Sequence, residues 1–386
     1  MKLPVYLDYH ATTPVDPRVF EAMRPYFSEH FGNAASQSHV FGWRAEAAVT
    51  KAREALAALV GANAREIVFT SGATESNNLA ILGAARPRFT PGAHLVTSAI
   101  EHRAVLDPCR RLESEGFALT YLMPDARGVT SAAAVAGALT ERTVLVSIMA
   151  ANNEIGTLNP VGEIARVCKE RQVLFHTDCA QALGKIPLDV HALGLDLVSF
   201  SAHKVCAPKG VGALFVRAVN PRVRLDPIVF GGGHERGLRS GTLDVPGIVG
   251  FGAAAEIAQA EGETEARRVS ALRDRLWERL RSRVDDLLRN GDPAACHPGN
   301  LNVTIPGAPA DAVMAEARDL AVSSGSACTS AEAAPSHVLL ALGRTRAEAE
   351  ASIRFGLGRF TTEEEVDWAA DELSRAVASV SARRPR

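Results

Sequence analysis

The sequence has 386 residues, of which 47% are hydrophobic and 22% charged, and its formal net charge is −2 at pH 7. This length favours two domains or one large domain with an appendage. The balanced charge lacks the basic excess of nucleic-acid binders, so we expect no direct nucleic-acid binding. No run approaches the roughly 18 apolar residues of a membrane span. Because Asp8 precedes any apolar signal region, we expect a cytoplasmic protein without membrane association.

Two residue types that carry chemistry are scarce. The sequence contains six cysteines and six lysines. No two cysteines have the Cys-x-x-Cys spacing of zinc or iron–sulfur cages, so we expect reduced thiols and no metal site of that kind. A reaction that needs an amine or a thiol therefore has few candidate residues.

Helical periodicity alternates with short apolar runs from residue 44 onward. Residues 44–61 are rich in Ala and Leu and stop at Gly61, which is typical of a helix end. Short β-branched runs then predict buried strands at residues 65–72, 93–100, 143–150, 172–178, 195–201 and 212–217. Helix-like segments such as 161–172 separate most of them. The sequence therefore predicts an α/β domain with a mainly parallel sheet.

The pattern changes beyond about residue 255. Residues 269–291 place Val and Leu along one helical face with charges opposite, and the pattern ends at Gly291. This predicts a long helix that leads into a second, smaller domain. We expect a large domain of residues 15–255 and a small domain formed by residues 1–14 and 256–386.

Polar clusters follow the predicted strands, at the edge where open parallel sheets bind ligands. Residues 73–76 form a small-residue turn that could bind an anion or simply cap a helix. His102 and the segment 152–156 follow the next two strands. A histidine in such a place can be structural or catalytic, and asparagines there often form turns. The pattern leaves these alternatives open.

Asp178 and Lys204 follow two successive strands about one strand–helix–strand unit apart. Pyridoxal phosphate needs such a pair, an amine for its aldehyde and a carboxylate for its pyridine nitrogen, together with a phosphate cradle. Lys204 alone among the lysines closes an apolar strand beside a histidine and a serine. A buried salt bridge is the alternative. A metal site at His176, Asp178 and Cys179 is weaker, because adjacent strand residues point to opposite faces.

Two further segments carry candidate residues. Glycines 231–233, followed by 239–242, allow close backbone approach but are weak evidence for nucleotide binding. Cys328 lies among small polar residues, whereas Cys109 and Cys168 lie on helical patterns, where buried inert thiols are usual. Cys328 is therefore the best candidate for a reactive thiol.

Taken together, these motifs resemble the NifS/IscS-type cysteine desulfurases, which are class V pyridoxal-phosphate enzymes of aminotransferase fold type I. The resemblance covers nearly the whole chain, through YLDYHATTPVDPRV, EIVFTSGATESNNLAI, TSAIEHRAVL, NNEIGT, HTDCAQALGK, SFSAHKV, GGGHERGLRSGT, AVSSGSACTS and IRFGLGRFTTEEE. The SSGSAC form is similar to that of the IscS-like group. The resemblance implies a mainly parallel seven-stranded sheet, a smaller α+β domain and pyridoxal 5'-phosphate as the cofactor.

The resemblance also implies roles for the residues around the cofactor ring. Lys204 would hold the cofactor covalently, and Asp178 would pair with its pyridine nitrogen. Gln181 would contact its phenolic oxygen. His102 would stack on the ring and assist proton transfers, and Asn153 would contact both cofactor and substrate.

Further roles follow for the phosphate and the substrate. The resemblance places the phosphate on Ala73, Thr74, Ser201 and His203. Thr242 would complete this cradle from the partner subunit, so a homodimer is implied. Arg354 would bind the carboxylate of L-cysteine by a two-pronged contact.

The implied activity is removal of sulfur from L-cysteine. The Cys328 thiolate would attack the substrate sulfur, and the products would be L-alanine and a persulfide on Cys328. A sulfur acceptor, such as an iron–sulfur scaffold or a thiolation enzyme, would take the sulfur, and Cys328 could be a shared iron–sulfur ligand in a scaffold complex. The alternatives are a selenocysteine lyase, another class V enzyme, or a non-enzymatic sulfur-carrier subunit.

Three features depart from the family pattern. His10 stands where the family commonly has a small polar residue. Cys179 and Cys206 flank the two cofactor motifs, where small core thiols are the simpler interpretation. The sequence stops at Arg386 without the longer tail with which some IscS proteins dock a scaffold. The sequence thus leaves the sulfur acceptor open.

Overall fold

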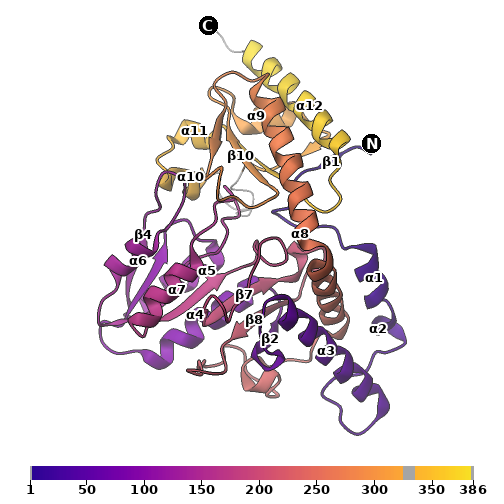
Figure 1. Cartoon of the computed structure of the whole chain (residues 1–386), viewed down its shortest axis with the longest axis vertical. Coiled ribbons are helices and arrows are strands. Elements are labelled where there is room, and N and C mark those ends of the chain that lie inside the picture. Colours follow the sequence, from indigo (N-terminus) through magenta and orange to yellow (C-terminus); the bar gives the residue numbers. More distant parts are fainter. Residues whose placement is uncertain (1, 325–334, 384–386) are drawn as a thin grey trace.

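The computed structural model describes residues 2–324 and 335–383. Its central sheet, in the lower half of Figure 1, has the strand order β2-β8-β7-β6-β5-β3-β4. Pairing is parallel from β7 through β4, whereas β8 runs antiparallel to both β2 and β7. The predicted mainly parallel, seven-stranded α/β fold is confirmed. The strands span β2 (Ile67–Thr70), β3 (His94–Ser98), β4 (Ala118–Leu122), β5 (Thr143–Ser147), β6 (Leu174–Asp178), β7 (Leu197–Ser201) and β8 (Gly212–Val216).

Helices cover both faces of this sheet, which explains why its strands are apolar throughout. Neighbouring strand residues alternate between two cores, as Val68 and Phe69 do in β2. One core lies under α4 (Ala73–Ala85) and α5 (Arg103–Ser114). The other lies under a group of helices that includes α1 (Pro17–Met23), α3 (Val40–Leu59), α6 (Ala132–Ala138), α7 (Val161–Glu170) and the start of α8 (Val245–Arg281).

A separate hydrophobic core lies at the other end of α8. It is built on a three-stranded antiparallel sheet in the order β12-β10-β9, with the second half of α8 packed against it. The N-terminal strand joins this part of the molecule, because β1 pairs with β11 in parallel. The division of the chain at residues 255/256 stays a prediction. The elements are β1 (Val5–Tyr6), β9 (Leu288–Asn290), β10 (Asn300–Thr304), α9 (Ala310–Glu316), β11 (Leu320–Ala321), β12 (Ser352–Gly356) and α12 (Glu363–Ala382).

The shorter helices connect these parts. They are α2 (Pro25–Ser28), α10 (His337–Ala341) and α11 (Arg346–Glu350). Among the described residues, no helix combines the length and the apolar character that a membrane crossing requires.

The predicted long helix at residues 269–291 has different bounds in the structure. The helix α8 begins 24 residues earlier, at Val245, where the Asp244 side chain accepts a hydrogen bond from the Gly247 N–H and Pro246 occupies the first turn. It ends at Arg281, and residues 288–290 form strand β9 instead. The apolar spacing continues through both elements, so periodicity could not detect where the helix ends and the strand begins. Pairing of β9 with β10 determines it.

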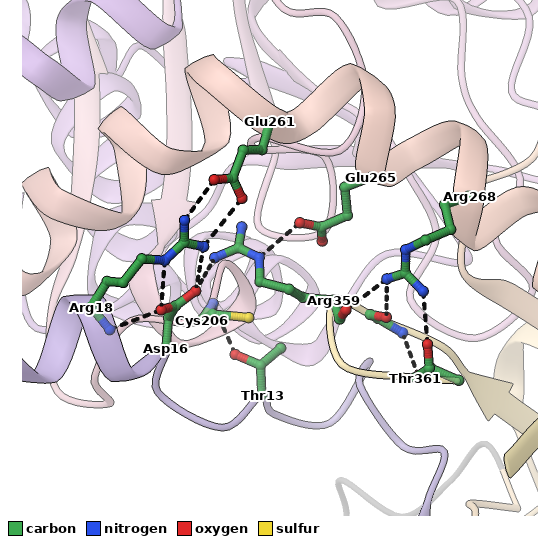
Figure 2. A network of polar contacts seen from close by, with 10 residues as sticks. Thr13, Asp16, Arg18, Cys206, Glu261, Glu265, Arg268, Arg359 and Thr361 are labelled. Carbon is green, nitrogen blue, oxygen red and sulfur yellow. Dashed lines mark hydrogen bonds and ion pairs between the residues drawn. The ribbon is translucent and has the colours of Figure 1, made fainter. Parts of the chain in front are cut away.

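A network of charged side chains ties the two cores together (Figure 2). Asp16, which precedes α1, is 1% exposed and accepts hydrogen bonds from Arg18 and Arg359. Arg359 follows β12 and also donates to Glu265 on α8. The hydrogen bonds from Arg18 lower the pKa of Asp16 to about 2. The network therefore holds the N-terminal segment, α8 and the end of β12 in one arrangement.

We expect Arg359→Leu to lower the free energy of unfolding by about 2–4 kcal/mol, because it removes one partner of a buried ion pair and leaves the carboxylates behind. Arg275→Leu is the matched control, since Arg275 pairs with Asp367 on the exposed face of α8 and α12. This control should change stability little. Urea unfolding of the two variants checks the prediction, which equal midpoints would contradict.

Candidate active site

A cavity of about 460 Å³ lies at the carboxyl ends of the parallel strands. It gathers an amine, a carboxylate, an amide and imidazoles from segments far apart in the sequence. The residues predicted from the sequence that line it are Ala73, Thr74, His102, Asn153, Asp178, Gln181, Ser201, His203 and Lys204. The structure thus brings together most of the predicted site.

One wall of the cavity is the N-terminus of α4. Gly72 precedes this helix with φ +151°, a conformation that favours glycine, and no side chain of the described residues caps the first turn. The backbone N–H groups of Ala73 and Thr74 therefore have no side-chain cap and lie beside the cavity, where the positive end of the helix favours an anion. The alternative that this turn serves only as its own helix cap does not agree with this geometry.

The Asp178 carboxylate ends β6 and is held by two donors. The Asn77 side chain donates to its Oδ2 at 2.7 Å, and the Ala180 N–H donates to its Oδ1 at 2.8 Å. Asn77 comes from α4, and sequence reasoning missed it because nothing local marks a helix residue as a partner of a strand end. The two donors fix the direction of the carboxylate, which is largely buried.

Lys204 lies in the short turn that follows β7. Its ammonium group donates hydrogen bonds to the backbone carbonyls of His10 and Ala11. The N-terminal segment thereby lies across the cavity, whose lining it joins through residues 10–12. An amine and the Asp178 carboxylate share one cavity, as the strand order predicts.

His102 is both structural and placed in the cavity. It is the N-cap of α5, and its Nδ1 accepts a hydrogen bond from the Ala104 N–H at 3.1 Å. The neutral ring therefore carries its proton on Nε2. Burial lowers the pKa of His102. The buried Glu101 carboxyl next to it accepts a hydrogen bond from the Met149 N–H, and burial raises the pKa of Glu101.

Arg354 is fully buried and lies behind the wall of the cavity rather than on its lining. Its Nη1 donates to the Asn153 carbonyl at 3.0 Å, and its Nη2 donates to Asp8 at 2.8 Å. Asn153 does line the cavity. Sequence reasoning missed Asp8, although a carboxylate in a motif-rich segment is a reasonable partner for a buried arginine.

Besides Arg354, two predicted residues are not placed in this cavity. Thr242 is exposed and does not line it in a single chain. Cys328 lies outside the described residues. On one side of that segment Ser323 pairs with the backbone of Arg354, and on the other side the Ser336 hydroxyl donates to the buried Glu154 carboxylate. Sequence reasoning singled out neither Glu154 nor Ser336.

The cysteines at the cofactor motifs are buried. Cys179 and Cys206 both have pKa values raised by burial, which disfavours the reactive thiolate. This supports their interpretation as core thiols. Among the residues that the structure describes, no group of three His, Cys, Asp or Glu side chains could hold a metal ion.

Comparison with known proteins gives consistent matches. The aminotransferase class-V family model matches residues 5–368. The cysteine desulfurase IscS of Anaeromyxobacter dehalogenans (strain 2CP-C) is 58% identical over 369 residues, 96% of this chain and 91% of that protein. The cysteine desulfurase IscS of Rickettsia rickettsii (strain Iowa) is 50% identical over 385 residues, 100% of this chain and 94% of that protein.

Solved structures agree with these matches. A NifS-like protein superposes with a TM-score of 0.90 at 37% identity, covering 97% of this chain and 99% of that chain. SspA in complex with cysteine superposes with a TM-score of 0.82 at 40% identity, covering 92% and 99%. The similarity therefore extends through both cores.

Burial raises the pKa of Glu154 from 4.5 to about 7. Because the folded protein keeps this proton where the unfolded chain loses it, the stability that Glu154 contributes is complete below pH 4.5 and is lost as pH rises through about 7. We expect Glu154→Gln, which cannot ionise, to gain stability relative to the wild type between pH 5 and pH 8. Urea unfolding at both pH values measures this, with the exposed Glu46→Gln as control. Parallel pH profiles of E154Q and the wild type would disprove it.

Proposed function

The chain belongs to the class V aminotransferase family and has the activity of a cysteine desulfurase, and on this premise we propose how its own residues perform the reaction. The substrate is L-cysteine, and the products are L-alanine and a persulfide on Cys328. The observation that carries the proposal is the single cavity that gathers Lys204, Asp178 and His102 beside the uncapped N-terminus of α4.

The residues of the cavity fit pyridoxal 5'-phosphate, the cofactor of this family. The N-terminus of α4 suits its phosphate, together with Ser201 and His203, which line the same cavity. Burial lowers the pKa of His203 to about 4, so its ring is a neutral hydrogen-bonding group at pH 7. When bound, the cofactor supplies an electron sink for the negative charge that develops at the substrate Cα.

Asp178, Lys204 and Gln181 surround the place for the ring of the cofactor. Asp178, oriented by Asn77, offers a carboxylate that keeps the pyridine nitrogen protonated. Gln181 would contact the phenolic oxygen. Lys204 would supply the amine that holds the cofactor, and the same amine would accept the Cα proton of the substrate.

His102 lines the same cavity and would assist proton transfers there. Its Nδ1 is engaged by the Ala104 N–H, so Nε2 is the nitrogen that holds the exchangeable proton. Its lowered pKa makes the neutral ring the resting form at pH 7. His102 therefore assists proton transfer without adding a second positive charge beside Lys204.

Arg354 and Asn153 recognise the substrate. Arg354 provides the guanidinium for the carboxylate of cysteine, and its present partner is Asp8. The related structure of SspA in complex with cysteine supports this substrate. The Cys328 thiolate then forms a bond to the substrate sulfur as the carbon–sulfur bond breaks. Protonation of the remaining carbon skeleton gives L-alanine.

The functional unit in this proposal is a homodimer. Large aromatic side chains are exposed on the segment 20–43 and near the glycines 231–233, and Phe31, Trp43 and Phe230 are 65%, 55% and 81% exposed. Phe31 also stacks on Phe41 with ring centroids 5.4 Å apart. Exposed apolar groupings of this kind mark interfaces. Thr242 of the partner subunit would then complete the phosphate cradle.

The remaining partners belong to the proposal as well. An iron–sulfur scaffold or a thiolation enzyme would accept the persulfide sulfur, and the similarity to cysteine desulfurases named IscS supports this chain as the sulfur donor. Neither nucleic acid nor membrane is a direct partner, and the cytoplasm is the expected location. Selenocysteine is the alternative substrate, and its turnover can be compared with that of L-cysteine.

We expect Lys204→Ala to abolish the visible absorbance of the bound cofactor and the release of alanine from cysteine, because no other described lysine except Lys209 lines the cavity. Cys328→Ser should keep the absorbance but lose persulfide and sulfide formation. Absorbance spectra, alanine quantification and mass spectrometry of the trapped persulfide measure these effects, with Lys209→Ala as control. Sulfide release by C328S at the wild-type rate would exclude the persulfide mechanism.

Phe31→Glu should weaken the dimer at least tenfold, since it places a charge in an apolar interface. Met123→Glu is the control, because Met123 is 61% exposed after β4, outside the aromatic segment. Sedimentation velocity over a concentration series measures both. A wild-type protein that sediments as a monomer would refute the proposed dimer.

A further inference from the structure

His10 is a buried side chain in the active-site cavity that the proposed reaction does not use. It is 2% exposed, lines the cavity and lies in the N-terminal segment that crosses the carboxyl edge of the sheet. Its backbone carbonyl accepts a hydrogen bond from the Lys204 amine. The residue thus touches the catalytic amine through its main chain, while its ring has separate partners.

Within the part of the chain that the structure describes, His10 is the residue that binds both ends of the Gln181 side-chain amide. The Gln181 Nε2 donates to the His10 carbonyl at 3.0 Å, and the Gln181 Oε1 lies 3.1 Å from the His10 Nδ1. Gln181 is itself nearly buried and lines the same cavity. Two contacts between one pair of residues define the plane of the amide and the direction in which each of its ends points.

These contacts indicate which nitrogen of the His10 ring carries the proton. The end of the amide that faces the His10 carbonyl must be the NH₂ group, because two oxygens at 3.0 Å would repel each other. The oxygen therefore faces Nδ1, and Nδ1 must donate. The other ring nitrogen, Nε2, lies 3.2 Å from the Gly299 carbonyl, which is a second acceptor.

A neutral ring has one proton for these two acceptors. Burial, and then the positive charges of Lys185 and Arg354, lower the pKa of His10 well below its usual range. The Gln181 oxygen, at 3.1 Å the nearer of the two acceptors, thus receives the proton, and Nε2 does not donate to the Gly299 carbonyl. The ring is kept in place by His297, whose ring meets it edge-on with centroids 4.7 Å apart. His297 in turn accepts a hydrogen bond from the Gly299 N–H.

We propose that His10 is a positioning residue that fixes the Gln181 amide with its NH₂ group, rather than its oxygen, toward the cofactor cavity. This inference rests on the proposed function, in which Gln181 contacts the phenolic oxygen of the cofactor. One hydrogen of Nε2 binds the His10 carbonyl, so the second remains for that oxygen. A flipped amide would present an oxygen to an anionic oxygen and weaken the contact.

Three substitutions of His10 separate its two ring nitrogens. His10→Asn places an amide nitrogen at the position of Nδ1, so it keeps the donor to Gln181. His10→Gln extends its amide to the position of Nε2, near the Gly299 carbonyl, and leaves Gln181 without its donor. His10→Leu removes both donors. The backbone carbonyl of residue 10, and with it the contact to the Lys204 amine, is present in each variant.

The decisive experiment measures equilibrium binding of pyridoxal phosphate to each apo protein and the pH titration of the visible absorbance of each reconstituted holoenzyme. We expect H10N to match the wild type in both. H10L and H10Q should bind the cofactor about fivefold more weakly, the effect of one lost hydrogen bond. Their absorbance should titrate at higher pH, because the phenolic oxygen loses a donor that stabilises its anionic form. Gln181→Leu should shift in the same direction, and thermal unfolding of the apo proteins establishes that each variant is folded.

Three results would overturn the inference. The first is wild-type binding and titration in H10L. The second is a normal H10Q with an impaired H10N, which would mean that the ring acts through Gly299. The third is a Gln181→Leu variant that behaves as the wild type. Failure of the proposed function is seen separately, because the wild-type protein would then show no visible absorbance that depends on Lys204.

Discussion

The candidate active site depends on one constraint, the parallel pairing of β3, β5, β6 and β7. Parallel strands end at the same edge of a sheet, so whatever follows each strand is brought to one place. Asp178 ends β6, and His102, Asn153 and Lys204 follow the other three strands; all four residues line one cavity. Strand β2 adds the N-terminus of α4 to the same edge. The sheet topology therefore brings the candidate catalytic groups together at one edge of the sheet.

The N-terminal segment is the second structural element on which the site relies. Its strand β1 pairs with β11 in the smaller core, and the residues that follow β1 cross the edge of the large sheet where the cavity lies. Its charged and polar side chains are buried only because distant groups satisfy them. Asp8 pairs with Arg354, and Asp16 pairs with Arg359. Removing the arginine from either pair would leave a carboxylate without one of its charged partners, which is costly at a largely buried site, and the pair of Asp16 with Arg359 helps to hold the two cores together.

Particular residues show how far sequence reasoning extends. Lys204 could be found because a lysine that closes a buried strand is unusual, and Gly61 could be read as a helix end, which its φ of +66° agrees with. The bounds of α8 could not be found, since apolar spacing continues into β9. Asn77 and Glu154 carry no local signal, because their importance comes only from partners far away in the chain. The assignment of Cys328 as the reactive thiol rests on the sequence and on the family resemblance.

The sequence by itself determined the alternation of strands and helices and the polar residue that follows each strand. These features depend on side-chain periodicity within a few residues, which is local. Tertiary structure alone decided the partners: Asp8 for Arg354, and His10 for both ends of the Gln181 amide. Such contacts join residues separated by 171 positions or more. Hydrogen-bond direction and burial select them, and both exist only once the chain has folded.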